Sequence, residues 1–127
     1  MMELSHDAEF WQELGDVCLS CGQCTMVCPT CTCYNVIDEI DLNKDTGQRI
    51  RYWDSCLFKD FSLTAGDHNF RAARSERLKL WYTHKLKAFI GKFGSPSCVG
   101  CGRCIVTCPV DINIKTVAEK LKKKRAL

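Results

Sequence analysis

The sequence predicts a mainly α fold with one small β-hairpin insert, and three observations support this prediction. One cysteine pattern occurs twice, in a loop at 18–29 and a loop at 98–109. Apolar residues recur at the helical spacing of three and four across 70–90. Two strand-like arms between 34 and 54 flank a polar link that ends in glycine. At 127 residues, the chain is expected to form a single domain, 1–127.

The two loops share the spacing C-x2-C-x2-C-x3-C followed by proline. Two-cluster ferredoxins hold 4Fe-4S clusters with such runs, and the fourth cysteine of each run ligates the other cluster. The pattern therefore predicts two 4Fe-4S clusters with crossed ligation. Cluster 1 would be held by Cys18, Cys21, Cys24 and Cys108, and cluster 2 by Cys98, Cys101, Cys104 and Cys28.

Zinc and disulfide bonds are the alternative uses of these cysteines. Structural zinc also binds C-x2-C pairs, but it needs four ligands and has no use for a three-cysteine loop with a remote fourth ligand, twice over. A disulfide framework needs a secreted context, and residues 1–15 contain no apolar run of signal-peptide length. Retained thiolates indicate a reducing compartment, so a cytoplasmic location is expected.

Three cysteines, Cys31, Cys33 and Cys56, lie outside the two runs. They are candidates for extra ligands, with His68 or His84 completing a further metal site. They are also candidates for small buried neighbours of the clusters, because free cysteine is among the most buried residue types. The second interpretation is favoured.

The chain begins with a predicted helix at 5–16 that Gly15 is expected to end. Phe10 and Trp11 on this helix either shield the first cluster or serve as ordinary packing aromatics. The hairpin insert at 34–54 follows the first loop. Opposite charges on its two arms are expected to pair across the strands, namely Asp38, Glu39 and Asp41 with Arg49 and Arg51.

A second helix is predicted at 70–90, capped by Asp67 or Asn69 and ended by glycines at 91 and 94. Its basic residues are expected mainly on a solvated face, with docking of an acidic partner or screening of the clusters as alternatives. They are Arg71, Arg74, Arg77, Lys79, Lys85 and Lys87. A final helix is predicted at 112–124, with Ile112, Val117 and Leu121 facing inward.

Composition excludes several classes of function. The formal charge of +3 counts cysteines as neutral, and eight thiolates with two oxidised cluster cores would bring the loaded protein to about −1. Nucleic acid is therefore not expected as a partner. No stretch approaches the ~20 apolar residues of a membrane span. The sequence holds no Gly-rich dinucleotide loop and no nucleophile with a matched histidine, so no catalytic site of its own is expected.

Several blocks beyond the cysteine runs carry a resemblance to a known family. These are Trp-Asp-Ser-Cys at 53–56, Gly-Asp-His-Asn-Phe-Arg at 66–71, Arg77 and His84-Lys85. Together with the two runs they resemble the dicluster domain of the β subunits of NAD(P)-linked nickel–iron hydrogenases, or sulfhydrogenases. The same domain is similar to that of the anaerobic sulfite reductases and of iron–sulfur subunits in heterodisulfide-reductase-like complexes.

The resemblance implies an α-helical-ferredoxin-like dicluster domain. It also implies electron transfer between a flavoprotein subunit that handles NAD(P)H and a further redox subunit of a multisubunit complex. Those β subunits usually carry a large N-terminal region ahead of the cluster domain, so this chain is either a short relative or an excised domain. A free diffusing ferredoxin and a metal-stabilised scaffold without redox turnover are the alternative functions.

Two sets of residues are candidates for tuning the clusters. Threonines at 25, 30, 32 and 107 are candidate hydrogen-bond donors to sulfur, although backbone N–H groups can do the same. Arg103 and Gln23 occupy the same position in the two runs and differ in charge. Arg103 is expected to favour the extra electron on cluster 2.

Overall fold

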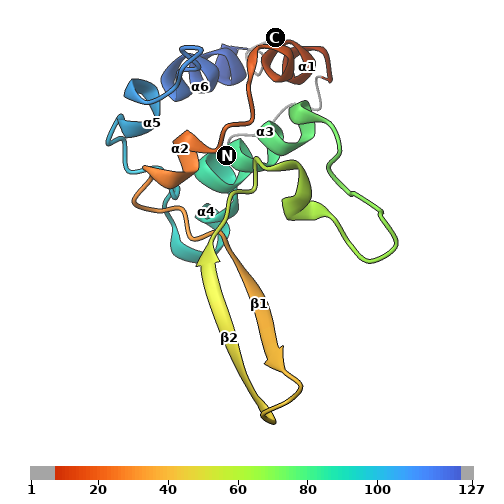
Figure 1. Ribbon diagram of the computed structural model, residues 1–127. Coiled ribbons are helices and arrows are strands. Elements are labelled where there is room, and N and C mark those ends of the chain that lie inside the picture. Colours follow the sequence, from red (N-terminus) through yellow and green to blue (C-terminus); the bar gives the residue numbers. More distant parts are fainter. Residues whose placement is uncertain (1–7, 124–127) are drawn as a thin grey trace.

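The computed structural model describes residues 8–123 and shows a body of short helices from which a β-hairpin projects (Figure 1). This arrangement agrees with the predicted mainly α fold. The helices are α1 (Ala8–Val17), α2 (Gln23–Met26), α3 (Arg74–Thr83), α4 (Ile90–Phe93), α5 (Arg103–Val106) and α6 (Ile114–Lys123). Between α3 and α4 the chain forms a π-helical segment, His84–Ala88, and a 3-10 helix spans Lys59–Ser62. No helix among residues 8–123 is long and apolar enough to cross a bilayer.

Helix α1 packs against α3, and Gly15 makes the close approach possible. A Cβ atom at Gly15 would lie 2.7 Å from the backbone nitrogen of Ser75 on α3. The prediction that Gly15 ends the first helix is therefore wrong, because the helix continues to Val17. Residues 5–7 of that predicted helix lie outside the described part of the chain. Glycine here serves helix packing rather than helix termination.

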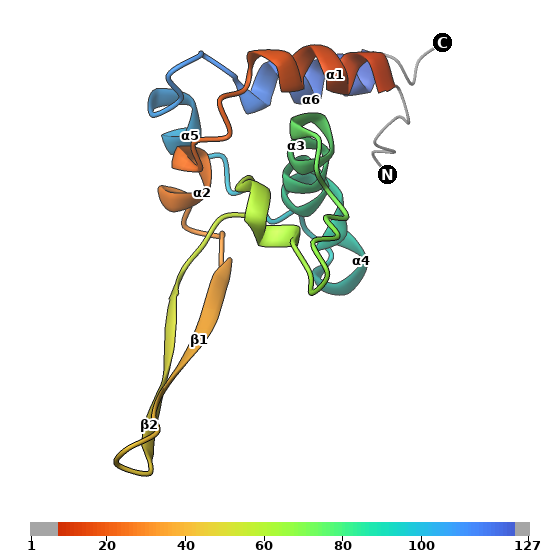
Figure 2. The ribbon, with the colours of Figure 1, turned by 45° about the vertical axis from the view of Figure 1, so that its right-hand side comes forward.

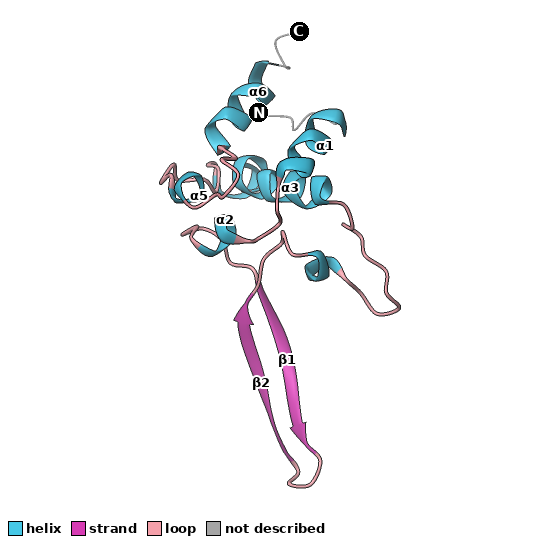
Figure 3. Cartoon of the chain, turned by 45° about the horizontal axis from the view of Figure 1, so that its top comes forward, coloured by secondary structure: helices cyan, strands magenta, loops and turns pink. Residues whose placement is uncertain are grey.

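The hairpin pairs β1 (Tyr34–Asp41) with β2 (Thr46–Trp53) in antiparallel register, as predicted. Asp38 lies opposite Arg49 and receives two hydrogen bonds from its guanidinium, at 2.7 and 2.9 Å. Figure 3 shows that the two strands extend away from the helices, so neither face packs on the body. Most side chains of both strands are accordingly exposed.

The long helix starts at Arg74 rather than near residue 70. The predicted cap, Asn69, is used in the preceding loop, where its side chain accepts from the Arg71 N–H and donates to the Lys59 carbonyl. Short polar side chains often satisfy loop backbone in this way instead of starting a helix. Gly94, in the left-handed conformation with φ 73°, ends the helical stretch, whereas Gly91 lies within α4.

The core lies where α1, α3 and α6 meet the segment around Leu57, and the termini of the described chain lie close together at one end (Figure 2). Its buried residues come from all four segments and from two cysteines. They are Phe10, Trp11, Cys18, Cys56, Leu57, Leu78, Trp81, Tyr82, Val117 and Leu121. Both cysteine loops rest on this core, so the packing of α3 positions the sulfur atoms described next.

Candidate metal centre

The two cysteine loops have nearly the same backbone. Gly22 and Gly102 both take the left-handed conformation, with φ 74° and 75°, and each precedes a single helical turn. The carbonyl of Gly22 accepts from the Met26 N–H at 3.1 Å, and that of Gly102 from the Val106 N–H at 3.3 Å. Non-glycine residues adopt this conformation at a cost, so the motif needs glycine after its second cysteine. The turns, α2 and α5, lie side by side (Figure 2).

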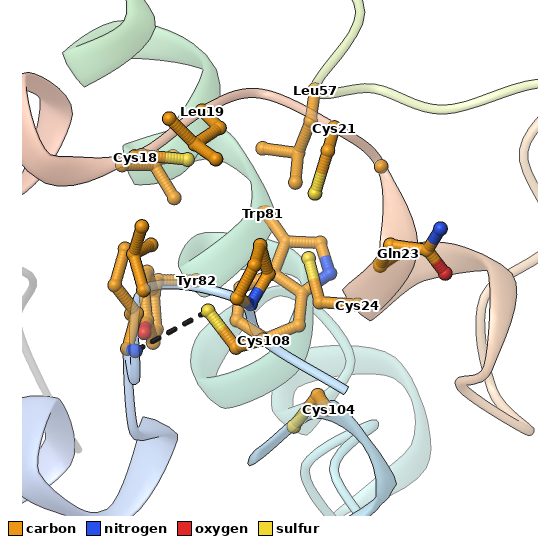
Figure 4. Close-up of a pocket in the computed structure, with 15 residues that line it drawn as sticks. Cys18, Leu19, Cys21, Gln23, Cys24, Leu57, Trp81, Tyr82, Cys104 and Cys108 are labelled. Carbon is orange, nitrogen blue, oxygen red and sulfur yellow. Dashed lines mark hydrogen bonds between the residues drawn. The ribbon is translucent and has the colours of Figure 1, made fainter. Parts of the chain in front are cut away.

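A first cavity gathers the leading cysteines of the first loop with the last cysteine of the second. In Figure 4 the sulfur atoms of Cys18, Cys21, Cys24 and Cys108 face a common space. Cys104 also borders this cavity, but its sulfur points away from the common space. Apolar side chains complete the lining, notably Leu57, Leu78, Trp81, Tyr82 and Ile112.

A second cavity has the complementary composition. Its cysteines are Cys98, Cys101 and Cys104 of the second loop and Cys28, the last cysteine of the first. Trp81 lies between the two cavities, because it lines both. Each cavity therefore joins three cysteines of one run to the fourth of the other.

The remaining cysteines lie beside these sites rather than within them. Cys31, Cys33 and Cys56 line a third cavity together with His84 and Lys85. The other candidate partner, His68, is not at this cavity and packs edge-on against Phe70 with ring centres 4.4 Å apart. Over residues 8–123, no three His, Cys, Asp or Glu side chains converge as ligands of a single metal ion.

Comparison of the sequence with known proteins identifies a family. Residues 17–112 match the model of a family described as a 4Fe-4S dicluster domain. The chain is also 35% identical over 122 residues to "Sulfhydrogenase 2 subunit beta" of Pyrococcus furiosus. That alignment covers 96% of this chain and 36% of the relative. No solved structure matches.

The chain belongs to the 4Fe-4S dicluster family. Its domain resembles that of hydrogenase β subunits, carries two 4Fe-4S clusters and serves electron transport. The chain spans about a third of the length of the sulfhydrogenase subunit, so the match describes that part alone.

The side chains that line the two cavities have the chemical groups that 4Fe-4S clusters need. Besides the thiols, the indole Nε1 of Trp81 and the hydroxyl of Tyr82 are buried and have no hydrogen-bond partner among the described residues. Both side chains line the first cavity. A buried donor without an acceptor is costly, and the sulfur atoms of a bound cluster are acceptors that would satisfy it. The unpartnered donors therefore support the fit.

The pKa values of the cysteine thiols also support the fit of the cavities to the clusters. Burial, with smaller contributions from the neighbouring cysteines Cys18 and Cys104, raises the pKa of the Cys24 thiol to about 12. Burial likewise raises the pKa of Cys18 and of Cys104. Thiolates crowded into an apolar cavity repel one another and are stable only beside compensating positive charge. Iron supplies that charge, since a coordinating thiol is deprotonated by its metal.

Hydrogen bonds to sulfur come mostly from the backbone. Ser20 N–H donates to Cys18 Sγ, and Ile112 N–H donates to Cys108 Sγ, both at 3.3 Å. Among the four predicted threonines, Thr30 lies 3.4 Å from Cys28 Sγ. Thr25 instead donates to the Gly22 carbonyl at 2.6 Å and lies 2.8 Å from Ser55 Oγ. Thr25, one of the candidate donors, therefore does not serve sulfur, and the backbone alternative is favoured.

The aromatic residues around the sulfurs are not those of the first helix. Phe10 and Trp11 belong to the core, where Trp11 packs on Tyr82 with ring centres 5.6 Å apart, and neither lines the first sulfur cavity. Ordinary packing is thus the role that their positions support. Trp81 and Tyr82 of α3 provide the aromatic lining instead.

Two of the basic residues expected on a solvated face are buried. Arg77 donates hydrogen bonds to the carbonyls of Leu57 and Ala72, at 2.9 and 2.6 Å. These bonds join the segment around Leu57 to α3. Lys85 lies inside, between the two loops. The expectation of a solvated face is therefore wrong for Arg77 and Lys85.

Proposed function

We propose that this domain relays single electrons through its two clusters between a flavoprotein subunit that handles NAD(P)H and a further redox subunit. The further subunit would be a hydrogenase or a related enzyme of the sulfite reductase or heterodisulfide reductase type. The name of the Pyrococcus relative and the sequence blocks shared with hydrogenase β subunits support this assignment. Eleven free cysteines suit a reducing compartment, so we place the protein in the cytoplasm.

The crossed ligand set is part of this proposal. Cluster 1 would be held by Cys18, Cys21, Cys24 and Cys108, and cluster 2 by Cys98, Cys101, Cys104 and Cys28. The observation that carries it is the composition of the two cavities, in each of which three cysteines of one loop meet the fourth of the other. Cys104 borders both cavities, but its sulfur points away from the first. Each cluster, when bound, accepts and returns one electron.

The protein's own residues supply holding, spacing and exclusion of water. Because each loop contributes to both cavities, the two sites are held against each other and share the Trp81 side chain as a wall. Leu57 and Leu78 close the inner side of the first cavity. The outer side of the second loop is open, with Val99 and Val106 exposed to 65% and 89% beside the exposed Cys101. Exposed apolar side chains around a redox site suit partner docking, so we assign partner exchange to this face.

Anaerobically prepared protein tests the proposal directly. We expect about eight iron and eight acid-labile sulfide per chain, and bleaching of the visible absorbance by dithionite. Anaerobic affinity purification from the native host should recover a flavin-containing chain. A monomer that exchanges electrons without any stable partner would favour a free ferredoxin, and clusters that resist reduction would favour a scaffold. About nine or more iron atoms per chain would support a further metal site at Cys31, Cys33 and Cys56.

A further inference from the structure

Lys85 is a buried cation at the boundary between the two cysteine loops. The residue is 3% exposed and lies in the π-helical segment that follows α3. Lysine is almost never fully buried unless it is paired, because desolvating an ammonium group is expensive. Among the described residues no carboxylate forms an ion pair with it. Some other negative group must therefore balance its charge.

The contacts of Lys85 lead to the cysteines. Its Nζ donates to Thr30 Oγ1 at 2.9 Å and lies 3.5 Å from Ser97 Oγ. Thr30 follows Cys28 by two residues, and Ser97 directly precedes Cys98. Lys85 lines one cavity together with Cys28 and a second cavity together with Cys31 and Cys33. The nearest available anions are thus thiolates, one of them a proposed ligand of cluster 2.

The backbone of Lys85 is tied to the same site. Its carbonyl accepts a hydrogen bond from the Cys98 N–H at 3.0 Å, which fixes the first cysteine of the second loop to the helix. π-helical segments are rare and occur frequently at functional sites. Lys85 lines the cavity of Cys28, Cys98, Cys101 and Cys104, and it is absent from the lining of the other sulfur cavity. Its charge therefore acts unequally on the two sites.

We propose that Lys85 is the internal counter-cation of the cluster held by Cys98, Cys101, Cys104 and Cys28, and makes it the stronger electron acceptor of the two. The inference rests on the ligand set of the proposed function. Reduction adds one electron, supplied by the reduced flavin partner or by dithionite in a test, and no bond is made or broken. The fixed ammonium favours the added negative charge, and does so strongly because the Lys85 side chain is buried away from water.

Redox titration followed by electron paramagnetic resonance tests this role in the full chain. Lys85→Met removes the charge and retains length and apolar packing, whereas Lys85→Arg retains the charge. We expect Lys85→Met to lower the reduction equilibrium constant of one cluster at least tenfold, equivalent to about 59 mV for one electron, and to move the other less. Lys85→Arg should stay near the original values. Lys87→Met is the matched control, because Lys87 lies in the same π-helical segment but lines neither sulfur cavity.

Several outcomes would overturn the role of Lys85. Unchanged potentials in Lys85→Met, or equal shifts of both clusters, would do so. If Lys85→Met fails to load iron, Lys85→Gln, which can still hydrogen-bond Thr30 and Ser97, carries the same test. Loss of iron from both neutral variants but not from Lys85→Arg would support a need for charge, and loss from all three would contradict it. Failure of the proposed function is distinguishable, because the unmodified chain would then lack two reducible clusters.

Discussion

The first and second cysteine loops carry the same motif on nearly the same backbone but lie in different surroundings. Gly22 is buried beneath the ring of Phe58, whereas the corresponding Gly102 has open space where a Cβ would lie. Thr25 is buried against Ser55, and its counterpart Ile105 is half-buried. The conformation of each loop is thus local, set by cysteine spacing and glycine, while its exposure depends on what the rest of the chain places over it.

This difference has consequences for electron transfer. Potentials of iron–sulfur clusters depend on hydrogen bonds to sulfur, net charge and solvent exposure. The first site has an apolar cover and the unpartnered hydroxyl of Tyr82, whereas the second has the buried cation Lys85 and the exposed side chains of Val99 and Val106. The unpartnered indole of Trp81 borders both sites. The two copies of one motif thus have unequal surroundings, and we expect unequal potentials for the two clusters of the proposed relay.

Substituting two proposed ligands at once should give the largest effect, and it tests whether the two loops exchange their fourth cysteines. If ligation is crossed, Cys28 and Cys101 serve the same cluster, so Cys28→Ser combined with Cys101→Ser should retain about four iron atoms per chain. Cys28 and Cys21 serve different clusters, so combining Cys28→Ser with Cys21→Ser should remove nearly all iron. Iron and sulfide analysis of anaerobically prepared variants measures both results.

The reverse result would contradict crossed ligation. If each run held its own cluster, Cys28 with Cys21 would retain four iron atoms and Cys28 with Cys101 would retain none. Cys33→Ser is a matched control, because Cys33 is a half-buried cysteine outside the two sulfur cavities. Its iron content should stay at about eight.

Alanine at the two equivalent glycines should give unequal losses of stability. Both positions have positive φ, so each Gly→Ala change is expected to destabilise by about 1 kcal/mol. At Gly22 the new Cβ would also lie 2.6 Å from the Phe58 ring, and such overpacking adds about 1–3 kcal/mol. The temperature of anaerobic thermal bleaching, at one scan rate, should therefore fall more for Gly22→Ala than for Gly102→Ala. Equal falls in this temperature would mean that the Phe58 ring moves aside without a cost in stability.

Much of this fold follows from local patterns, and the parts that do not follow depend on tertiary contacts. Cysteine spacing and the trailing proline predicted both loops, and the Gly-ending polar link predicted the hairpin, because these features act within a few residues. Gly15 was misassigned because only the approach of α3 shows why a side chain is excluded there. The start of the second helix was misplaced because Asn69 bonds Lys59, a residue ten positions away.

The cavities show the same division between local and long-range information. Periodicity predicted a helix at 70–90, yet nothing in the pattern indicated that Trp81, Tyr82 and Lys85 line the sulfur cavities. The segment at 55–58 had no recognised role, although it forms the cover over the first loop. The block Trp-Asp-Ser-Cys at 53–56 was the available signal, since it accompanied the cysteine runs in the resemblance.

Removing Phe58 from the segment that covers the first loop should bring the rate of iron loss at the first site closer to that at the second. In the unmodified protein we expect iron to be lost in two phases on exposure to oxygen or a chelator, the faster one from the open second site. Phe58→Ala removes the ring over Gly22 and should speed the slower phase severalfold while leaving the faster one unchanged. Absorbance at the cluster band, recorded over time, measures both phases. Phe61→Ala, in the neighbouring 3-10 helix, serves as the comparison, because Phe61 is not among the atoms nearest to Gly22.

The smallest expected effect is that of Arg103, the charged counterpart of Gln23. The sequence pattern assigned it to favour the electron on cluster 2, and its position beside Cys104 allows this direction of effect. Its side chain is exposed, however, and solvent and salt weaken an exposed charge far more than a buried one. Arg103→Gln should therefore lower the potential of that cluster by less than Lys85→Met does, and the shift should shrink further as ionic strength rises. If Arg103→Gln moved the potential more than Lys85→Met, surface charge rather than the buried ammonium would distinguish the two sites.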